Sequence, residues 1–199
     1  VPMVLGLSFL AKPVWQIFYG TSNLGVSVFS YSIFTAIFYS LFLNIHTIMQ
    51  SVDNNKVANI SIISGLITKL CLTVPLIILF SKIPFIKTYY ASITATILAY
   101  IVPITISLIC LHKTLNISFK ETFIKAFKII ISCLLMIIVL TVLKLIIPLT
   151  GGKIYSLIII VIYAAIGGLV YFTLTSKMHV FEDIFECSLK DFIKRKLRR

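Results

Sequence analysis

The stretch VANISIISGLITKLCLTVPLIILF, residues 57–80, decides the fold class of this chain. Lys69 is its only charged residue, and most of the other side chains are apolar. A helix of about 20 such residues crosses the hydrocarbon core of a bilayer, which is ~30 Å thick. The stretch is therefore predicted to span a membrane as one α-helix.

The whole chain has the composition of a membrane protein. Of its 199 residues, 59% are hydrophobic and 12% are charged, and the mean hydropathy is +1.08. A soluble domain needs about 25% charged residues. Long apolar blocks separated by irregular polar connectors predict an all-α, polytopic transmembrane bundle and do not fit the alternating strands of a barrel. The bundle is expected over residues 1–175 and a basic tail over 176–199, with six spans near residues 1–19, 24–49, 57–80, 91–111, 129–149 and 154–175.

Lysine and arginine in the connectors predict the orientation of this bundle. Of the 18 basic residues, twelve lie in the even-numbered connectors and the tail, and three lie in the other connectors. The last three, Lys12, Lys69 and Lys144, lie inside spans. Since cytoplasmic loops carry the excess of basic residues, the C-terminus is predicted to be cytoplasmic. The net charge of +12 is then accounted for by basic residues at the membrane surface, and no nucleic-acid partner is predicted.

Two basic segments are predicted to form interfacial helices. In Ser118–Lys128, Ser118 and Glu121 fit a capping box and phenylalanines alternate with lysines. In the tail, residues 176–199, apolar side chains recur at helical spacing opposite basic ones. Such segments lie on the anionic lipids of the inner leaflet. The plainer alternative is a positively charged anchor with no further role.

The sequence offers no set of residues for enzymatic chemistry, so an enzyme is not predicted. None of the six carboxylates falls within a span, which leaves no buried pair for acid–base catalysis or for a metal. The three histidines lie far apart in sequence, and the four cysteines show no paired spacing. We therefore predict neither a metal site nor a cofactor.

Polar residues inside the spans are the candidate site. Lys69 lies about eleven residues from either end of its span, which corresponds to ~17 Å at helical rise. At this depth the extended side chain cannot easily bring its ammonium group to the interface. Thr68 and Lys69 are expected on the helical face of Ser61 and Gly65. The functional interpretation is a cation that lines the path of an anionic substrate or stands in for a coupling cation. The alternative is a structural lysine paired with a carboxylate or carbonyl elsewhere in the bundle.

Two further groups of residues are weaker candidates. Lys12 precedes Pro13, which is expected to bend the first span, and functional and structural interpretations of this lysine stay open. In the second span a polar stripe indicates a hydrated cavity or, alternatively, interhelical hydrogen bonds. The stripe comprises Ser27, Tyr31, Thr35, Tyr39 and His46. Small residues are expected only to pack helices closely, and they are Ala91, Ala95 and Ala99, and Ala164 with Gly168.

Three stretches together resemble the later half of polysaccharide and lipid-oligosaccharide flippases. They are GLSFLAKPVWQIFYG, residues 6–20; IMQSVDNNKVANISIISGLITKLCLTVPLI, residues 48–77; and YYASITATILAY, residues 89–100. Their order and spacing agree with that pattern across roughly residues 1–175. The family is the MOP exporter superfamily, in the branch of bacterial polysaccharide transporters, sporulation-type proteins and MurJ-like lipid II flippases. The first stretch follows a non-methionine Val1 without a basic leader, so we expect the chain to start partway through a longer protein.

The resemblance implies a two-lobed helical protein that moves a lipid-linked sugar from the inner to the outer leaflet of the bacterial plasma membrane by alternating access. It implies a further N-terminal lobe and a central cavity for the headgroup. Within such a cavity, Lys69 is our first candidate for a headgroup contact and Lys12 our second. The turn SVDNN, residues 51–55, departs from the family because it lacks the glycine and proline found there in many members. The alternatives are a drug or cation exporter of the same superfamily, a polytopic membrane enzyme, or a membrane scaffold protein.

Overall fold

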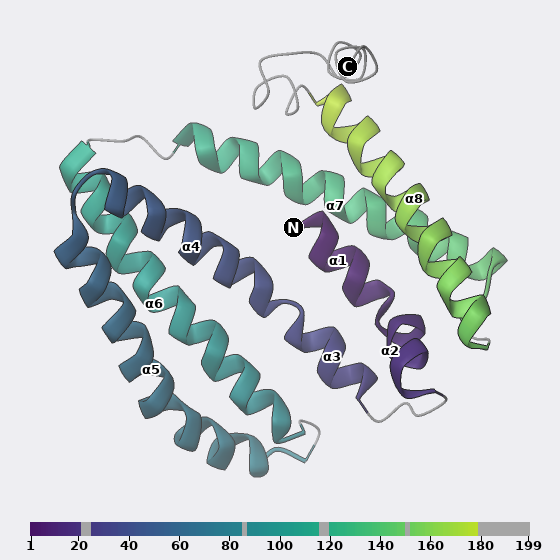
Figure 1. Cartoon of the computed structure of the whole chain (residues 1–199), viewed down its shortest axis with the longest axis horizontal. Helices are drawn as coiled ribbons and strands as arrows, with labels where there is room; N and C mark the ends of the chain where they lie inside the picture. The colour runs from purple at the N-terminus through teal and green to yellow at the C-terminus, as the bar shows by residue number, and fades with distance from the viewer. Residues whose placement is uncertain (21–24, 85–86, 116–119, 150–151, 179–199) are drawn as a thin grey trace. The chain divides into compact units, whose positions relative to one another are not determined.

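The predicted all-α fold is confirmed by a computed structural model, which describes residues 1–20, 25–84, 87–115, 120–149 and 152–178 (Figure 1). These residues form helices and connecting turns. The helices are α1 (Pro2–Phe9), α2 (Ala11–Tyr19), α3 (Val26–Ser32), α4 (Thr35–Ser51), α5 (Asn55–Ser81), α6 (Tyr89–Leu115), α7 (Lys120–Ile146) and α8 (Lys153–Lys177).

Five segments of the described residues are long and apolar enough to cross a membrane, so the chain is a multi-pass membrane protein by length and composition. They correspond to the second through sixth predicted spans, and the segment Val26–Ser51 combines α3 and α4. The first predicted span differs, because it is divided at Leu10 into the short helices α1 and α2. Pro13 lies in the first turn of α2, where its missing N–H leaves few hydrogen bonds unmade.

The fifth predicted span begins earlier than expected. α7 starts at Lys120 and continues without a break to Ile146, so residues 120–128 are its first turns and not a separate interfacial helix. Ser118 and the side chain of Glu121 lie outside the described residues, as does the tail beyond Met178. The capping box and the amphipathic tail therefore stay predictions.

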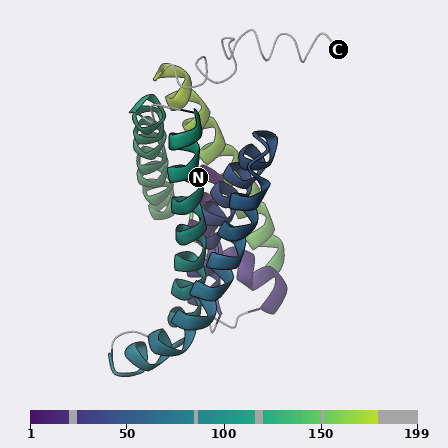
Figure 2. The same ribbon diagram turned by 90° about the vertical axis from the view of Figure 1, so that its left-hand side faces the viewer.

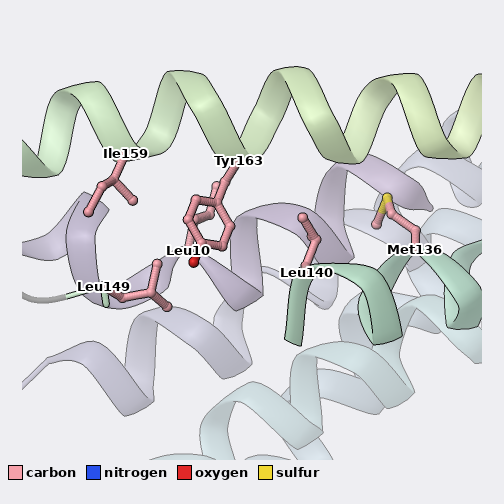
Figure 3. Close-up of a cluster of buried hydrophobic side chains, with 6 residues drawn as sticks. All are labelled: Leu10, Met136, Leu140, Leu149, Ile159 and Tyr163. Carbon is pink, nitrogen blue, oxygen red and sulfur yellow. The ribbon is translucent and has the colours of Figure 1, made fainter. Parts of the chain in front are cut away.

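The chain divides into two compact units, which we describe separately. The first unit comprises residues 1–26 and 119–199, and its helices α1, α2, α7 and α8 pack around one hydrophobic core. Figure 3 shows the six buried side chains of this core, which are Leu10, Met136, Leu140, Leu149, Ile159 and Tyr163. Leu10 is thus buried at the point where the first predicted span breaks.

Hydrogen bonds tie α7 and α8 together at both of their ends. Tyr163 donates its hydroxyl to the carbonyl of Ile147 at 2.7 Å, and Tyr155 donates to the carbonyl of Pro148 at 3.2 Å. These carbonyls follow the last turn of α7, where a helix leaves acceptors unpaired. At the opposite end, Lys128 Nζ donates to the carbonyl of Met178 at 3.4 Å.

Removing the Tyr163 hydroxyl is expected to destabilise this unit. Tyr163→Phe leaves the Ile147 carbonyl without its donor, beside a ring that is 1% exposed, and should cost about 1–2 kcal/mol of unfolding free energy. Tyr155→Phe is the matched control, because Tyr155 is 38% exposed and its removal should change stability by less than about 0.5 kcal/mol. Unfolding of the detergent-solubilised protein measures both, and equal effects would contradict the assignment.

The small-residue face predicted for α8 is displaced by one residue. Ala164 is exposed, and a Cβ added at Gly168 would meet nothing within 4 Å, so this pair does not mark a contact in the unit. Gly167 is buried instead, and a Cβ added there would lie 3.4 Å from Leu140. The packed face follows Ser156, Ile159, Tyr163 and Gly167, since the large buried tyrosine fixes the rotation of the helix.

The second unit, residues 27–118, is built around the pair α5 and α6, which run side by side (Figures 1 and 2). The close contact predicted for Ala91, Ala95 and Ala99 is confirmed, because they are 0%, 0% and 7% exposed. From α5, Ala58, Ser61 and Gly65 are buried. Small side chains at this spacing let two helix backbones approach closely.

Gly65 marks the tightest point of this contact. A Cβ at residue 65 would lie 2.7 Å from the carbonyl oxygen of Ala99 and 3.1 Å from Cγ of Pro103. Pro103 has no N–H, so the α6 carbonyl four residues earlier, that of Ala99, receives no bond from it. Glycine, which has no Cβ, therefore fits at residue 65 against the Ala99 carbonyl and the Pro103 ring.

The turn from α4 to α5 contains a non-glycine residue with a positive φ. Asp53 adopts a φ of 59°, in the left-handed region that favours glycine. Its carboxylate accepts a bond from Asn55 Nδ2 at 3.1 Å, and aspartate is among the residues that tolerate this conformation. The bond from Asn55 thus accompanies the left-handed backbone of Asp53 at this turn.

Candidate transport site

Lys69 lies near the middle of Asn55–Ser81, the longest of the candidate membrane spans among the described residues, as expected. α5 is continuous from Asn55 to Ser81, which puts Lys69 about 18 Å from the nearer end at helical rise. Its side chain is exposed in the structure. An exposed cation at this depth is costly in lipid, so the position favours a wet or polar surrounding.

The helical face expected for Lys69 is only partly correct. Ser61 and Gly65 face α6 and are buried, and Thr68 beside them is half-buried and donates to the carbonyl of Ser64 at 2.7 Å. Lys69 lies at the edge of this contact, about 80° around the helix from Ser61, which explains its exposure. Lys69 therefore borders the α5–α6 pair and is not part of its packing.

No carboxylate of the described residues can neutralise Lys69 within this unit. Asp53 is the one acidic residue whose side chain the structure describes, and it precedes α5 by a distance of roughly 24 Å along the axis from Lys69. The alternative of an internal ion pair thus finds no partner among the described side chains.

The polar stripe of the second span lies along α6. Tyr31 and Thr94 share a hydrogen bond at 3.3 Å, and the Tyr31 ring meets Tyr90 edge-on with centroids 4.9 Å apart. On the next helix, α4, Tyr39 packs on Tyr100 of α6, and the two ring centroids are 5.7 Å apart. The structure therefore brings Tyr31 and Tyr39 onto one seam, and the interhelical bond predicted as an alternative is present at Tyr31.

His46 continues this seam toward the end of α4. Its ring stacks on Phe42 with centroids 5.7 Å apart, and its Nε2 lies 3.1 Å from Nε2 of Gln50. Which of the two nitrogens donates depends on the tautomer of the ring. Thr35 does not join the seam by hydrogen bonding, because its hydroxyl donates to the carbonyl of Ser32.

Lys12 belongs to the other unit and is half-buried on α2. Buried Ala11 and Pro13 flank it. One turn later on the same side of the helix, Gln16 accepts a bond from the hydroxyl of Ser156 at 3.4 Å. A cation and an amide thus form a small polar patch on α2.

Sequence reasoning missed a polar face on α4. Ser40, Asn44 and Thr47 are exposed, and their spacing puts them on one side of the helix. The signal was present in the sequence, because hydroxyl and amide residues recur there every three or four positions. Among the described residues, no group of three or more histidines, cysteines or acids is placed to hold a metal.

The chain is similar to Lipid II flippase MurJ of Bacillus subtilis (strain 168), with 29% identity over 203 aligned positions that include 98% of the chain. The chain spans about a third, 36%, of the length of that relative. No protein-family model and no solved structure matches it. The resemblance to the flippase branch of the MOP exporter superfamily, first drawn from three sequence stretches, is thereby confirmed.

Proposed function

We propose that the chain is part of a flippase that carries a lipid-linked sugar precursor across the bacterial plasma membrane for cell-envelope synthesis. The observation that carries this proposal is Lys69, an exposed cation at mid-span with no carboxylate partner among the described side chains. Similarity to a lipid II flippase over nearly the whole chain supports the class of substrate. No covalent bond of the substrate changes in such transport.

In the proposed mechanism, Lys69 contacts the pyrophosphate of the substrate. An ammonium group bonds a phosphate oxygen strongly in a site from which bulk water is partly excluded. Thr68, adjacent on α5, and Lys12, on α2, are the next candidates for headgroup contact, followed by the α4 side chains Tyr31, Tyr39 and His46. The site then opens to one side of the membrane at a time.

The proposed setting follows from the distribution of charge. The C-terminus lies in the cytoplasm, where the basic tail contacts anionic lipids of the inner leaflet. A further lobe, outside the part of the relative that this chain matches, completes the cavity.

The proposal is tested by transport in liposomes. The full-length protein is reconstituted with fluorescently labelled lipid II, and the label exposed on the outer surface is measured over time. We expect the protein to move lipid II across the bilayer, and not a labelled phospholipid of equal chain length. Movement of both lipids would indicate a general scramblase, and movement of neither would end the proposal.

A further inference from the structure

The second candidate span, Val26–Ser51, is divided between α3 and α4 (Figure 1). α3 ends at Ser32 and α4 begins at Thr35, so the break lies roughly 11 Å from the first end of the span at helical rise. Neither glycine nor proline causes it, because residues 26–51 contain none of either. Other features of the local sequence therefore build the break.

The backbone at the break follows the hydrogen-bond spacing of a 3₁₀ helix. The N–H groups of Phe34 and Ala36 donate to carbonyls three residues back, at 3.2 and 3.0 Å. In an α-helix the acceptor lies four residues back. A short 3₁₀ stretch inside a helix is typical of a hinge, because small changes of φ and ψ convert one spacing into the other.

Hydroxyl and β-branched side chains favour this break. In a continuous helix the carbonyl of Ser32 would accept from the N–H of Ala36, but that N–H donates to Ile33. The hydroxyl of Thr35 donates to the Ser32 carbonyl instead, at 2.7 Å. Since an unpaired carbonyl is costly in a membrane, this bond lets the helix break within the span.

The two sides of the break are held to different degrees. None of the seven residues of α3 is buried. On α4, by contrast, Met49 is buried. Tyr39 and Phe42 of α4 also pack on Tyr100 of α6, with ring centroids 5.7 and 5.9 Å apart. α4 is therefore fixed on α6 more firmly than α3 is.

Tyr31 joins α3 to α6. Its hydroxyl shares a hydrogen bond with the hydroxyl of Thr94 at 3.3 Å, and its ring meets Tyr90 edge-on with centroids 4.9 Å apart. The Thr94 hydroxyl also donates to the carbonyl of Tyr90 at 2.8 Å. A single hydrogen bond between neutral groups adds little net free energy, so this contact can open and close reversibly.

We propose that Ile33 and Phe34 form a hinge in the second span, and that the hydrogen bond between Tyr31 and Thr94 is a latch that holds α3 on α6. When the latch opens, α3 turns about the hinge while α4 stays packed on α6. The proposal goes beyond the proposed function, because it concerns the motion of one span and no substrate.

Distances between spin labels test the hinge. The full-length protein is cleared of its native cysteines, placed in nanodiscs and labelled at two new cysteines that replace Val26 and Ser40, on either side of the break. Labels at Lys56 and Leu70, the same number of positions apart in the unbroken α5, are the matched control. We expect two distances across the break and a single distance on α5. Two distances on α5 as well would assign the spread to the labels and overturn the proposal.

Deletion of single hydroxyls tests the latch. Tyr31→Phe removes the bond and keeps the ring, so the ratio of open to latched protein should rise about fivefold. Thr94→Val removes the other hydroxyl and should give a similar rise. Tyr100→Phe, which keeps its ring contacts with α4, should leave the ratio within about twofold of the parent.

Two outcomes would overturn the proposal. A single narrow distance across the break in the parent and in Tyr31→Phe would exclude the hinge. A rise in Tyr100→Phe equal to that in Tyr31→Phe, or no rise in both Tyr31→Phe and Thr94→Val, would exclude the latch. Because the nanodiscs contain no lipid II, neither outcome bears on the proposed function.

Discussion

Replacing Lys69 by alanine in the full-length protein is expected to lower the rate of lipid II transport at least about thirtyfold. Loss of one partner of a desolvated charge contact weakens binding by about 2–5 kcal/mol, and 1.4 kcal/mol corresponds to a factor of ten. The amount of protein in the membrane should not fall, because the variant removes a cation from mid-span, which membrane insertion disfavours by about 3 kcal/mol. Initial rates in proteoliposomes and quantification of the reconstituted protein measure the two quantities.

Two variants separate charge from position. Lys144 also lies in a candidate span and is exposed, but it occupies the last turn of α7, where its ammonium reaches the interface. Lys144→Ala should therefore transport within about twofold of the parent. Lys69→Arg keeps the charge and should retain more activity than Lys69→Ala. Transport at the parental rate by Lys69→Ala, or an equal loss in Lys144→Ala, would refute the role of Lys69.

Gly65→Ala is expected to destabilise the second unit by about 1–3 kcal/mol, and Gly65→Val by more. The new Cβ would lie 2.7 Å from the carbonyl oxygen of Ala99, which is backbone and cannot rotate away, so α5 and α6 have to separate. This penalty opposes the gain of up to ~1 kcal/mol that alanine brings over glycine inside a helix. Thermal unfolding of the protein in detergent, followed by intrinsic fluorescence, measures the difference.

Gly168→Ala provides the control for this variant. Gly168 lies inside α8, and a Cβ there would meet nothing within 4 Å, so only the helical preference of alanine acts. We expect an unchanged or slightly raised unfolding temperature. If Gly65→Ala behaved in the same way, the close approach of α5 to Ala99 would not exist in the folded protein.

The fold class and most spans could be predicted because they depend on summed hydropathy. Ends and breaks depend on local packing instead. The division at Leu10 follows from burial of that side chain in a core built largely by α7 and α8, elements far away in sequence. The early start of α7 was hidden because lysines interrupt its first turns without ending the helix.

The depth of Lys69 within its span could be predicted from the sequence. The side of α5 on which it lies relative to the packed face could be predicted only in part. Counting along the helix placed Lys69 at mid-span, and the continuous α5 bears this out. Ala99 and Pro103 of α6 determine which side of α5 packs. The rotation of α5 about its own axis could therefore be predicted only in part. On α8, Gly167 and Gly168 are adjacent, so the sequence does not tell which of them lies on the packed face. The burial of Tyr163 identifies the face of Gly167.

The hydrogen bonds at the two ends of α7 and α8 have a consequence for motion. Tyr163 and Tyr155 hold one end of the pair, and Lys128 holds the other. A hairpin fastened at both ends cannot slide along its own axis without breaking a bond at each end. The pair should therefore open in a single cooperative step, and its amide hydrogens should exchange with one shared free energy.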